Sequence, residues 1–297
     1  MANDITLSSA TRTNLLSLQN TSNLIGQTQQ RLATGLKVNS ALDDALAFFK
    51  ARNLNSRATD LSSIKDAISG GVSVITAAVQ GLSTIESVLS QMKAIAQSAI
   101  SAPESLTRAK LASQFNELRS QVDNLAEDSS FNGVNLLKNS TGAFTAGADQ
   151  LTVKFNERTD QAAVNQLVIS GLKAADFTKI VASSAVATGS PGAAGLWGQT
   201  GASAVTAINS SIRAIDSALV TVRQAAQEFG TNAAMLSIRA EFTTQIINTL
   251  KAGAADLVNA DMNEESANLL SLQTRQQLGT ISLSIAQRSE QSILRLF

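Results

Sequence analysis

Two pairs of adjacent carboxylates near predicted helix starts are the residues whose types and spacing could do acid–base chemistry. One pair is Asp43 and Asp44, and the other is Glu264 and Glu265. Acidic residues at the start of a helix also interact favourably with the helix dipole, without any chemistry. No third polar partner points to catalysis at either pair. We therefore interpret the first pair as a helix cap. The second pair precedes the last helix and has the same interpretation, but it could equally contact Arg or Lys on a neighbouring molecule.

The composition removes most other catalytic chemistry. The chain has no His and no Cys, so the commonest general base, the commonest metal ligand, thiolate metal sites and disulfides are absent. Gly189, Gly192 and Gly195 lack the dinucleotide-binding spacing, and no strand leads directly into a helix there. The sequence predicts a protein that is not an enzyme and that uses no cofactor or metal.

The charge balance indicates which partners the chain does not favour. The formal net charge is zero and only 15% of the residues are charged, so neither nucleic acid nor an anionic membrane surface is favoured. The first ten residues contain no basic region followed by an apolar core, and no later run is expected to reach membrane-spanning length. Composition leaves both a cytoplasmic location and export without such a signal open.

Three long helices are predicted from apolar residues spaced alternately three and four apart. The first begins with a capping box of Ser40 and Asp43 and ends at Pro103, and the second covers residues 105–128. The third covers residues 205–257, a length of roughly 80 Å that requires an antiparallel bundle. The seam of the first helix consists of Leu61, Ile64, Ile68, Ile75, Ala78, Leu82, Ile85, Leu89, Met92, Ala96 and Ala99.

Two features depart from these seams. Gly71 lies on the first seam, where a close backbone approach or a bend is expected. Between the second and third helices, residues 151–155 and 167–169 have the pattern of short strands. Residues 185–203 have the composition of a loop, in which Trp197 is the lone aromatic residue.

The two ends of the chain have weaker seams than the middle. Near the N terminus, leucine and isoleucine recur every seven residues, with Asn14, Thr21 and Thr28 between them, and near the C terminus Gln276, Gly279 and Glu290 interrupt the seam. Such half-polar helices are marginal in isolation, so we expect them to order only inside an assembly. The predicted fold class is mainly α: a long antiparallel bundle or coiled coil with paired terminal helices and a small β-hairpin in the middle.

Three segments resemble a known family. Residues 32–47 (LATGLKVNSALDDALA) resemble the N-terminal signature of bacterial flagellins, and residues 261–297, beginning DMNEESANLLSLQ, resemble their C-terminal segment. Residues 131–134 (FNGV) match the family's turn after the second helix. The resemblance covers roughly residues 1–137 and 205–297, and the short middle is similar to alphaproteobacterial members with little or no outer domain.

The resemblance implies a filament subunit that is exported unfolded through the flagellar type III secretion channel and located in the extracellular flagellum. The implied partners are copies of the chain itself, sister flagellins, an export chaperone, and the cap and hook-junction proteins. Residues 1–35 with 259–297 would form the coiled-coil filament core. Residues 36–258 would form a bundle domain, with 139–204 as a small outer region that could carry O-linked sugars.

Two sets of site residues follow. Those expected to be buried in the terminal coiled coil, with partners on neighbouring subunits, are Leu18, Ile25, Leu32, Leu269, Leu272, Leu283, Ile293 and Phe297. At the family's innate-receptor site, Ser90, Met92, Ala94 and Gln114 depart from the pattern of stimulatory flagellins, so weak or absent receptor activation is expected.

Two other functions remain as alternatives. A hook–filament junction protein has similar helical ends, but the close match at residues 261–297 argues against it. A flagellin-derived surface adhesin would need an aromatic platform for sugar stacking, and the middle region offers only Trp197.

Overall fold

The computed structural model describes residues 9–138, 145–157, 165–172, 196–198 and 201–294. In chain order the elements are α1 (Ser9–Thr34), α2 (Ala45–Ser101), α3 (Ser105–Asp128), β1 (Gln150–Lys154), β2 (Gln166–Ser170), the 3-10 turn η1 (Leu196–Gly198), α5 (Ala202–Val258) and α6 (Met262–Leu294). The mainly α fold with a small hairpin confirms the predicted class.

The chain divides into two compact units. One contains Met1–Ala58 and Asn248–Phe297, and the other contains Thr59–Ile247. Both boundaries fall inside long helices, α2 and α5. The division expected from the sequence, at residues 35 and 259, coincides instead with the ends of α1 and α5.

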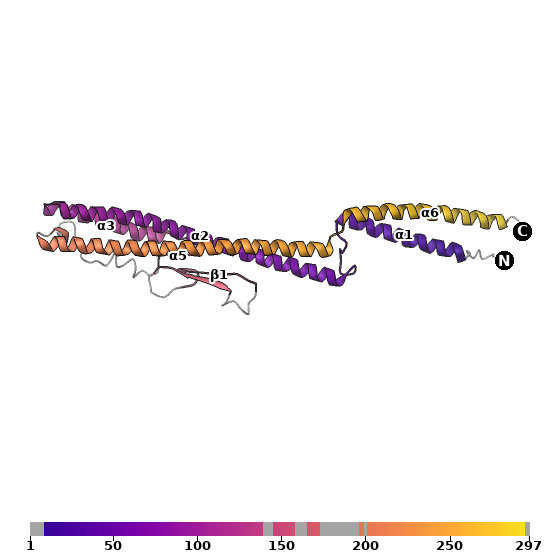
Figure 1. Cartoon of the computed structure of the whole chain (residues 1–297), viewed down its shortest axis with the longest axis horizontal. Helices are drawn as coiled ribbons and strands as arrows, with labels where there is room; N and C mark the ends of the chain where they lie inside the picture. The colour runs from indigo at the N-terminus through magenta and orange to yellow at the C-terminus, as the bar shows by residue number, and fades with distance from the viewer. Residues whose placement is uncertain (1–8, 139–144, 158–164, 173–195, 199–200, 295–297) are drawn as a thin grey trace. The chain divides into compact units, whose positions relative to one another are not determined.

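The core of the larger unit is a seam of fully buried side chains along α2, α3 and α5, which lie side by side (Figure 1). The three-four spacing predicted this face, because residues at that spacing share one side of a helix. On α2 the seam residues buried to 1% exposure or less are Ile68, Ile75, Ala78, Leu82, Ile85, Leu89, Met92, Ala96 and Ala99. On α5 the core includes Ile208, Ile215, Val222, Phe229 and Leu236.

The hairpin packs on this core through one face of each strand. β1 pairs antiparallel with β2, with Leu151 opposite Ile169 and Val153 opposite Leu167. Leu151, Val153 and Ile169 are buried in the core cluster. After β1, Phe155 lies under the guanidinium of Arg239 on α5, 5.1 Å from the ring centre. The strands are therefore covered on one face by the bundle.

Gly71 provides the space for the hairpin, which confirms the close approach expected there. A Cβ atom at Gly71 would lie 2.8 Å from a methyl group of Val153, with Leu236 and Leu151 at 3.5 and 3.6 Å. The approaching atoms are side chains from β1 and α5. Gly70, the next residue, has no atom within 4 Å of its hypothetical Cβ.

The start of α2 differs from the prediction. Asp43 Oδ2 accepts from the Ser40 backbone N–H at 2.9 Å, which is one half of the predicted capping box, but the Ser40 hydroxyl accepts from the Leu42 N–H, and the Asp43 N–H donates to the Ser40 carbonyl. These bonds close a turn, however, and the helix begins only at Ala45. Asp44 is the actual cap, because its Oδ1 accepts from the Ala47 N–H at 2.9 Å.

Trp197 is a core residue, in contrast to the lone loop aromatic expected from the sequence. Its side chain is fully buried, and its ring centre lies 5.0 Å from that of Phe115. Arg108, itself buried, donates from Nε to the Trp197 carbonyl and from Nη1 to the carbonyls of Ala102 and Pro103 after α2. Trp197 therefore cannot stack on a sugar, and most of the predicted loop lies outside the described residues.

The expectation that no run reaches membrane-spanning length was wrong for α2. This helix contains an 18-residue window with a mean hydropathy of 1.4, long and apolar enough to cross a membrane by length and composition alone. Only 39% of the window is buried. Within the bundle, the large apolar side chains of α2 from Ile68 to Met92 lie buried or partly buried in the core, as expected for the core helix of a bundle.

The two adjacent glycines of α2 generate a stability prediction. Gly71→Ala should lower the free energy of unfolding by about 1–2 kcal/mol, because the new methyl group overlaps Val153 and forces the hairpin to shift. Gly70→Ala should raise it by up to about 1 kcal/mol through helix propensity. Chemical denaturation of both variants measures the difference, and equal changes would contradict the role given to Gly71.

Candidate subunit-packing surface on the terminal helices

The terminal helices α1 and α6 form an antiparallel pair within the smaller unit, where they lie side by side (Figure 1). The direction follows from two contacts along the pair. Arg31, near the end of α1, donates from Nη1 to Glu265 Oε1 near the start of α6 at 3.0 Å. Leu18, about thirteen residues earlier, lies against Gly279, about fourteen residues later.

The predicted packing residues lie along this pair as far as the structure describes them. Leu18, Ile25, Leu32, Leu269, Leu272 and Leu283 are all half-buried. The polar residues of the seam are enclosed as well, since Thr11 and Thr28 are buried and Asn14, Thr21 and Gln276 are half-buried. The side chain of Ile293 and the whole of Phe297 lie outside the described residues. Within this chain, the contact between α1 and α6 thus contains both aliphatic and polar side chains, and most of them are only partly buried.

Both terminal helices also carry large aliphatic side chains that face away from the pair. These exposed residues are Leu15, Leu16 and Leu24 on α1 and Leu270, Leu278, Ile281 and Ile285 on α6. The four on α6 fall within one stripe, because their spacing of eight, three and four residues returns to the same side of a helix. The seven-residue spacing does not predict them, because it follows a single seam, although the adjacent pairs Leu15–Leu16 and Leu269–Leu270 indicate a second apolar face.

Backbone hydrogen bonds join the segments that link these helices to α2 and α5. The Lys37 N–H donates to the Val258 carbonyl at 2.8 Å, and the Ala260 N–H donates to the Gly35 carbonyl at 2.9 Å. Gly35 has φ +71, a left-handed conformation that ends α1 at little cost. Asp261 then caps α6, because its Oδ1 accepts from the Asn263 N–H at 2.8 Å.

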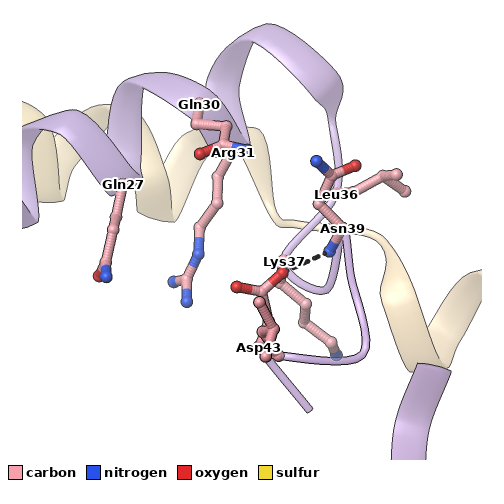
Figure 2. Close-up of a pocket in the computed structure, with 8 residues that line it drawn as sticks. Gln27, Gln30, Arg31, Leu36, Lys37, Asn39 and Asp43 are labelled. Carbon is pink, nitrogen blue, oxygen red and sulfur yellow. Dashed lines mark hydrogen bonds between the residues drawn. The ribbon is translucent and has the colours of Figure 1, made fainter. Parts of the chain in front are cut away.

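A polar hollow lies beside the first linking segment (Figure 2). Figure 2 shows Asp43 hydrogen-bonded to Asn39, near the side chains that come from α1. Donation from the backbone N–H groups of Ser40 and Asn39 holds the pKa of the Asp43 carboxyl below its ordinary value. The lining residues are Gln27, Gln30, Arg31, Leu36, Lys37, Asn39, Leu42 and Asp43, among which Leu42 is 97% exposed.

Three of the four paired carboxylates, those of Asp43, Asp44 and Glu265, make structural contacts. Asp44 accepts the backbone hydrogen bond that caps α2, as interpreted from the sequence, whereas the bonds to Asp43 close the turn before the helix. Glu265 is buried and pairs with Arg31 of its own chain, so the contact with a neighbouring molecule suggested for it is replaced by an internal one. In the described part of the chain, no group of three or more metal-ligating side chains comes together.

The four positions that the resemblance predicts at an innate-receptor site do not share one environment. Ser90, Ala94 and Gln114 are exposed on α2 and α3. Met92 is fully buried in the core of the bundle. Only the three exposed residues can touch a second protein without unfolding of the helix.

Two family models match the chain. The model of the bacterial flagellin N-terminal helical region matches residues 3–141, and that of the C-terminal helical region matches residues 212–297. Among solved structures, a protein of Vibrio parahaemolyticus assigned as a flagellar hook-associated protein superposes with a TM-score of 0.57. It covers 73% of this chain and all of its own, at 15% identity, which shows a shared fold alone.

Curated relatives match over nearly the whole chain. Flagellin FljM of Caulobacter vibrioides is 33% identical over 99% of this chain and 98% of its own length. Flagellin FljK of the same organism is 33% identical over 95% of this chain and 94% of its own, and a flagellin of Brucella melitensis is 29% identical over 100% and 99%. The chain therefore belongs to the bacterial flagellins, the structural subunits of the flagellar filament.

Proposed function

We propose that the α1–α6 pair is the surface through which copies of this chain assemble into the filament core. The observation that carries the proposal is the set of exposed aliphatic side chains on both terminal helices, beside a seam that is only half-buried. Contiguous exposed apolar surface of this kind marks an interaction site. The predicted packing positions that the structure describes, from Leu18 to Leu283, would then complete their burial only in the polymer.

The pair should gain order on assembly. Long helices without a well-packed partner are marginal in water, and this seam contains buried threonines where a stable coiled coil has aliphatic residues. In this proposal residues 1–35 and 259–297 act as the assembling part, and residues 36–258 fold as a bundle with a small outer region at 139–204. Export of the unfolded chain and an extracellular location follow from the family and rest on the same proposal.

The partners beyond the chain itself are sister flagellins, an export chaperone, the cap and the hook-junction protein. The exposed aliphatic faces of α1 and α6 would need cover before assembly, which supports a chaperone. We propose no catalytic role, because Asp43 already closes a turn, Asp44 caps α2 and Glu265 is in an ion pair, while Glu264 is exposed in the first turn of α6. The junction-protein alternative gains no support, since its structural likeness is limited to fold.

Far-ultraviolet circular dichroism of monomer and filament tests the assembly-coupled folding. α1 and α6 contain 26 and 33 residues, so the helical content should rise on polymerisation by up to about a fifth of the chain. A monomer as helical as the filament would contradict the proposal. Monomer below the critical concentration, in the same buffer, serves as the reference.

One exposed leucine on α6 tests the surface itself. Leu278→Gln should raise the critical concentration for polymerisation roughly tenfold, because it removes a large apolar contact of about 1.5 kcal/mol or more between subunits. Leu106→Gln is the matched control, since Leu106 is similarly exposed but lies on α3 of the bundle. Equal effects of the two substitutions on seeded filament growth would show that the terminal pair has no special part in assembly.

The exposed receptor-site positions support weak activation of the innate flagellin receptor. Ser90→Arg should increase activation of reporter cells, because it restores an exposed side chain that the family resemblance associates with stimulation. Met92→Arg should instead destabilise the bundle by about 4 kcal/mol, since it buries an unpaired charge, which a denaturation curve measures. Full-strength activation by the unmodified protein would contradict the expectation.

A further inference from the structure

The starting observation is that α6 is apolar on two opposite faces. The face turned to α1 holds Leu269, Leu272, Gln276, Gly279, Leu283 and Ala286, at alternating spacings of three and four. The face turned away holds Leu270, Leu278, Ile281 and Ile285. At 100° per residue the two stripes lie roughly half a turn apart. The exposed face therefore carries more large aliphatic side chains than the buried one.

Hydrophobic burial alone does not explain why α6 packs on α1 through its inward face. A fully buried Leu or Ile contributes about 1.5–3 kcal/mol, and on that measure the outward stripe is at least as good a partner for α1 as the inward one. A helix rotated by half a turn would then leave the wrong face for neighbouring copies. Something other than apolar area must select the inward face.

The inward face contains Gly279, whose missing side chain leaves space for Leu18 of α1. We call this space the notch. A Cβ atom at Gly279 would lie 2.7 Å from Leu18 Cδ2 and 3.1 Å from Leu18 Cγ, so the Leu18 side chain lies directly on the glycine backbone. None of the four outward residues is a glycine, so a rotated α6 would present bulk to Leu18 where the observed pair has space. Glycine costs about 1 kcal/mol in a helix interior relative to alanine, and this contact gives a reason for it here.

A second contact on the same face acts at the other end of the pair. Glu265 is fourteen residues before Gly279, four helical turns at the heptad spacing, and therefore on the same side of α6. Its carboxylate is buried and pairs with Arg31 at 3.0 Å. Rotation of α6 would separate this pair and expose the carboxylate, whereas rotation costs no apolar area.

We propose that Gly279, as the notch for Leu18, is a positioning residue that selects which face of α6 packs on α1 and so which face is presented to neighbouring subunits. Glu265 with Arg31 secures the same orientation at the opposite end. This inference rests on the proposed function, because the outward face matters only if copies of the chain pack on it. It goes further in assigning the orientation of α6 to a steric fit rather than to hydrophobicity.

Polymerisation of the full-length chain tests the notch. Gly279→Leu should raise the critical concentration at least roughly tenfold, because its side chain overlaps Leu18. Leu18→Ala in the same chain should restore it to within about threefold of the unmodified protein, since the new leucine then fills the space that Leu18 vacates. Gly230→Leu on α5 of the bundle, where no atom lies within 4 Å of the added Cβ, is the matched control and should leave the value unchanged.

Cysteine pairs report the orientation directly, because the chain has no cysteine of its own. The two contacts along the pair place Thr21 level with Gln276. In assembled filaments, Thr21→Cys with Gln276→Cys should form an intrachain disulfide, and Thr21→Cys with Leu278→Cys should not. Adding Gly279→Leu should lower the first yield severalfold.

Two results would overturn the inference: failure of Leu18→Ala to rescue Gly279→Leu, or equal disulfide yields from the inward and outward pairs. Failure of the proposed function has a different signature, which is equal helicity of the unmodified monomer and filament. The two ideas can therefore fail separately. If α1 and α6 were already folded in the monomer, Leu18→Ala would still be expected to rescue the polymerisation of Gly279→Leu.

Discussion

The behaviour of this chain depends on how little apolar surface α1 and α6 can bury against each other. Thr11 and Thr28 are buried in their seam, and the aliphatic residues between them are only half-buried. Ordering a residue costs about 1–2 kcal/mol in backbone entropy, and a seam of this composition offsets that cost poorly. The remaining apolar contacts must come from outside the pair, and the exposed stripes on both helices are where they are available.

In the larger unit, residues 59–247, the buried apolar surface is large enough to offset the entropy cost of ordering the chain. Its α2 seam is fully buried over nearly its whole length, and the hairpin and Trp197 add core contacts from the middle of the chain. Its surface is polar but carries few charges, and many Ser and Thr side chains there donate to the carbonyl four residues earlier, as Ser69, Ser90 and Thr231 do. A surface whose hydroxyls are already paired can be covered by another molecule with little desolvation cost.

Regular spacing explains what the sequence could and could not predict. The bounds of the bundle helices could be predicted to within a few residues, because helices that pack on a continuous core have apolar residues at regular spacings of three and four. Contacts between distant segments leave none: the fit of Trp197 against Phe115, the pairing of Arg31 with Glu265, and the capping of α2 by Asp44 rather than Ser40 all depend on where the chain folds back. The outward stripe of α6 was missed because a single-seam test discards the second face.

Two of the glycines inside helices, Gly71 and Gly279, mark places where shape rather than apolar area decides the packing. At Gly71 a strand side chain occupies the space of the missing methyl group, and at Gly279 Leu18 does. In both places a helix gives up about 1 kcal/mol of intrinsic stability and gains a partner that fits at only one rotation about its axis. For the bundle this fixes the hairpin within a core already stable. The two faces of α6 are similarly apolar, so there the glycine contact fixes the rotation of the helix about its own axis. A polymer built from many identical contacts requires the same rotation in every copy.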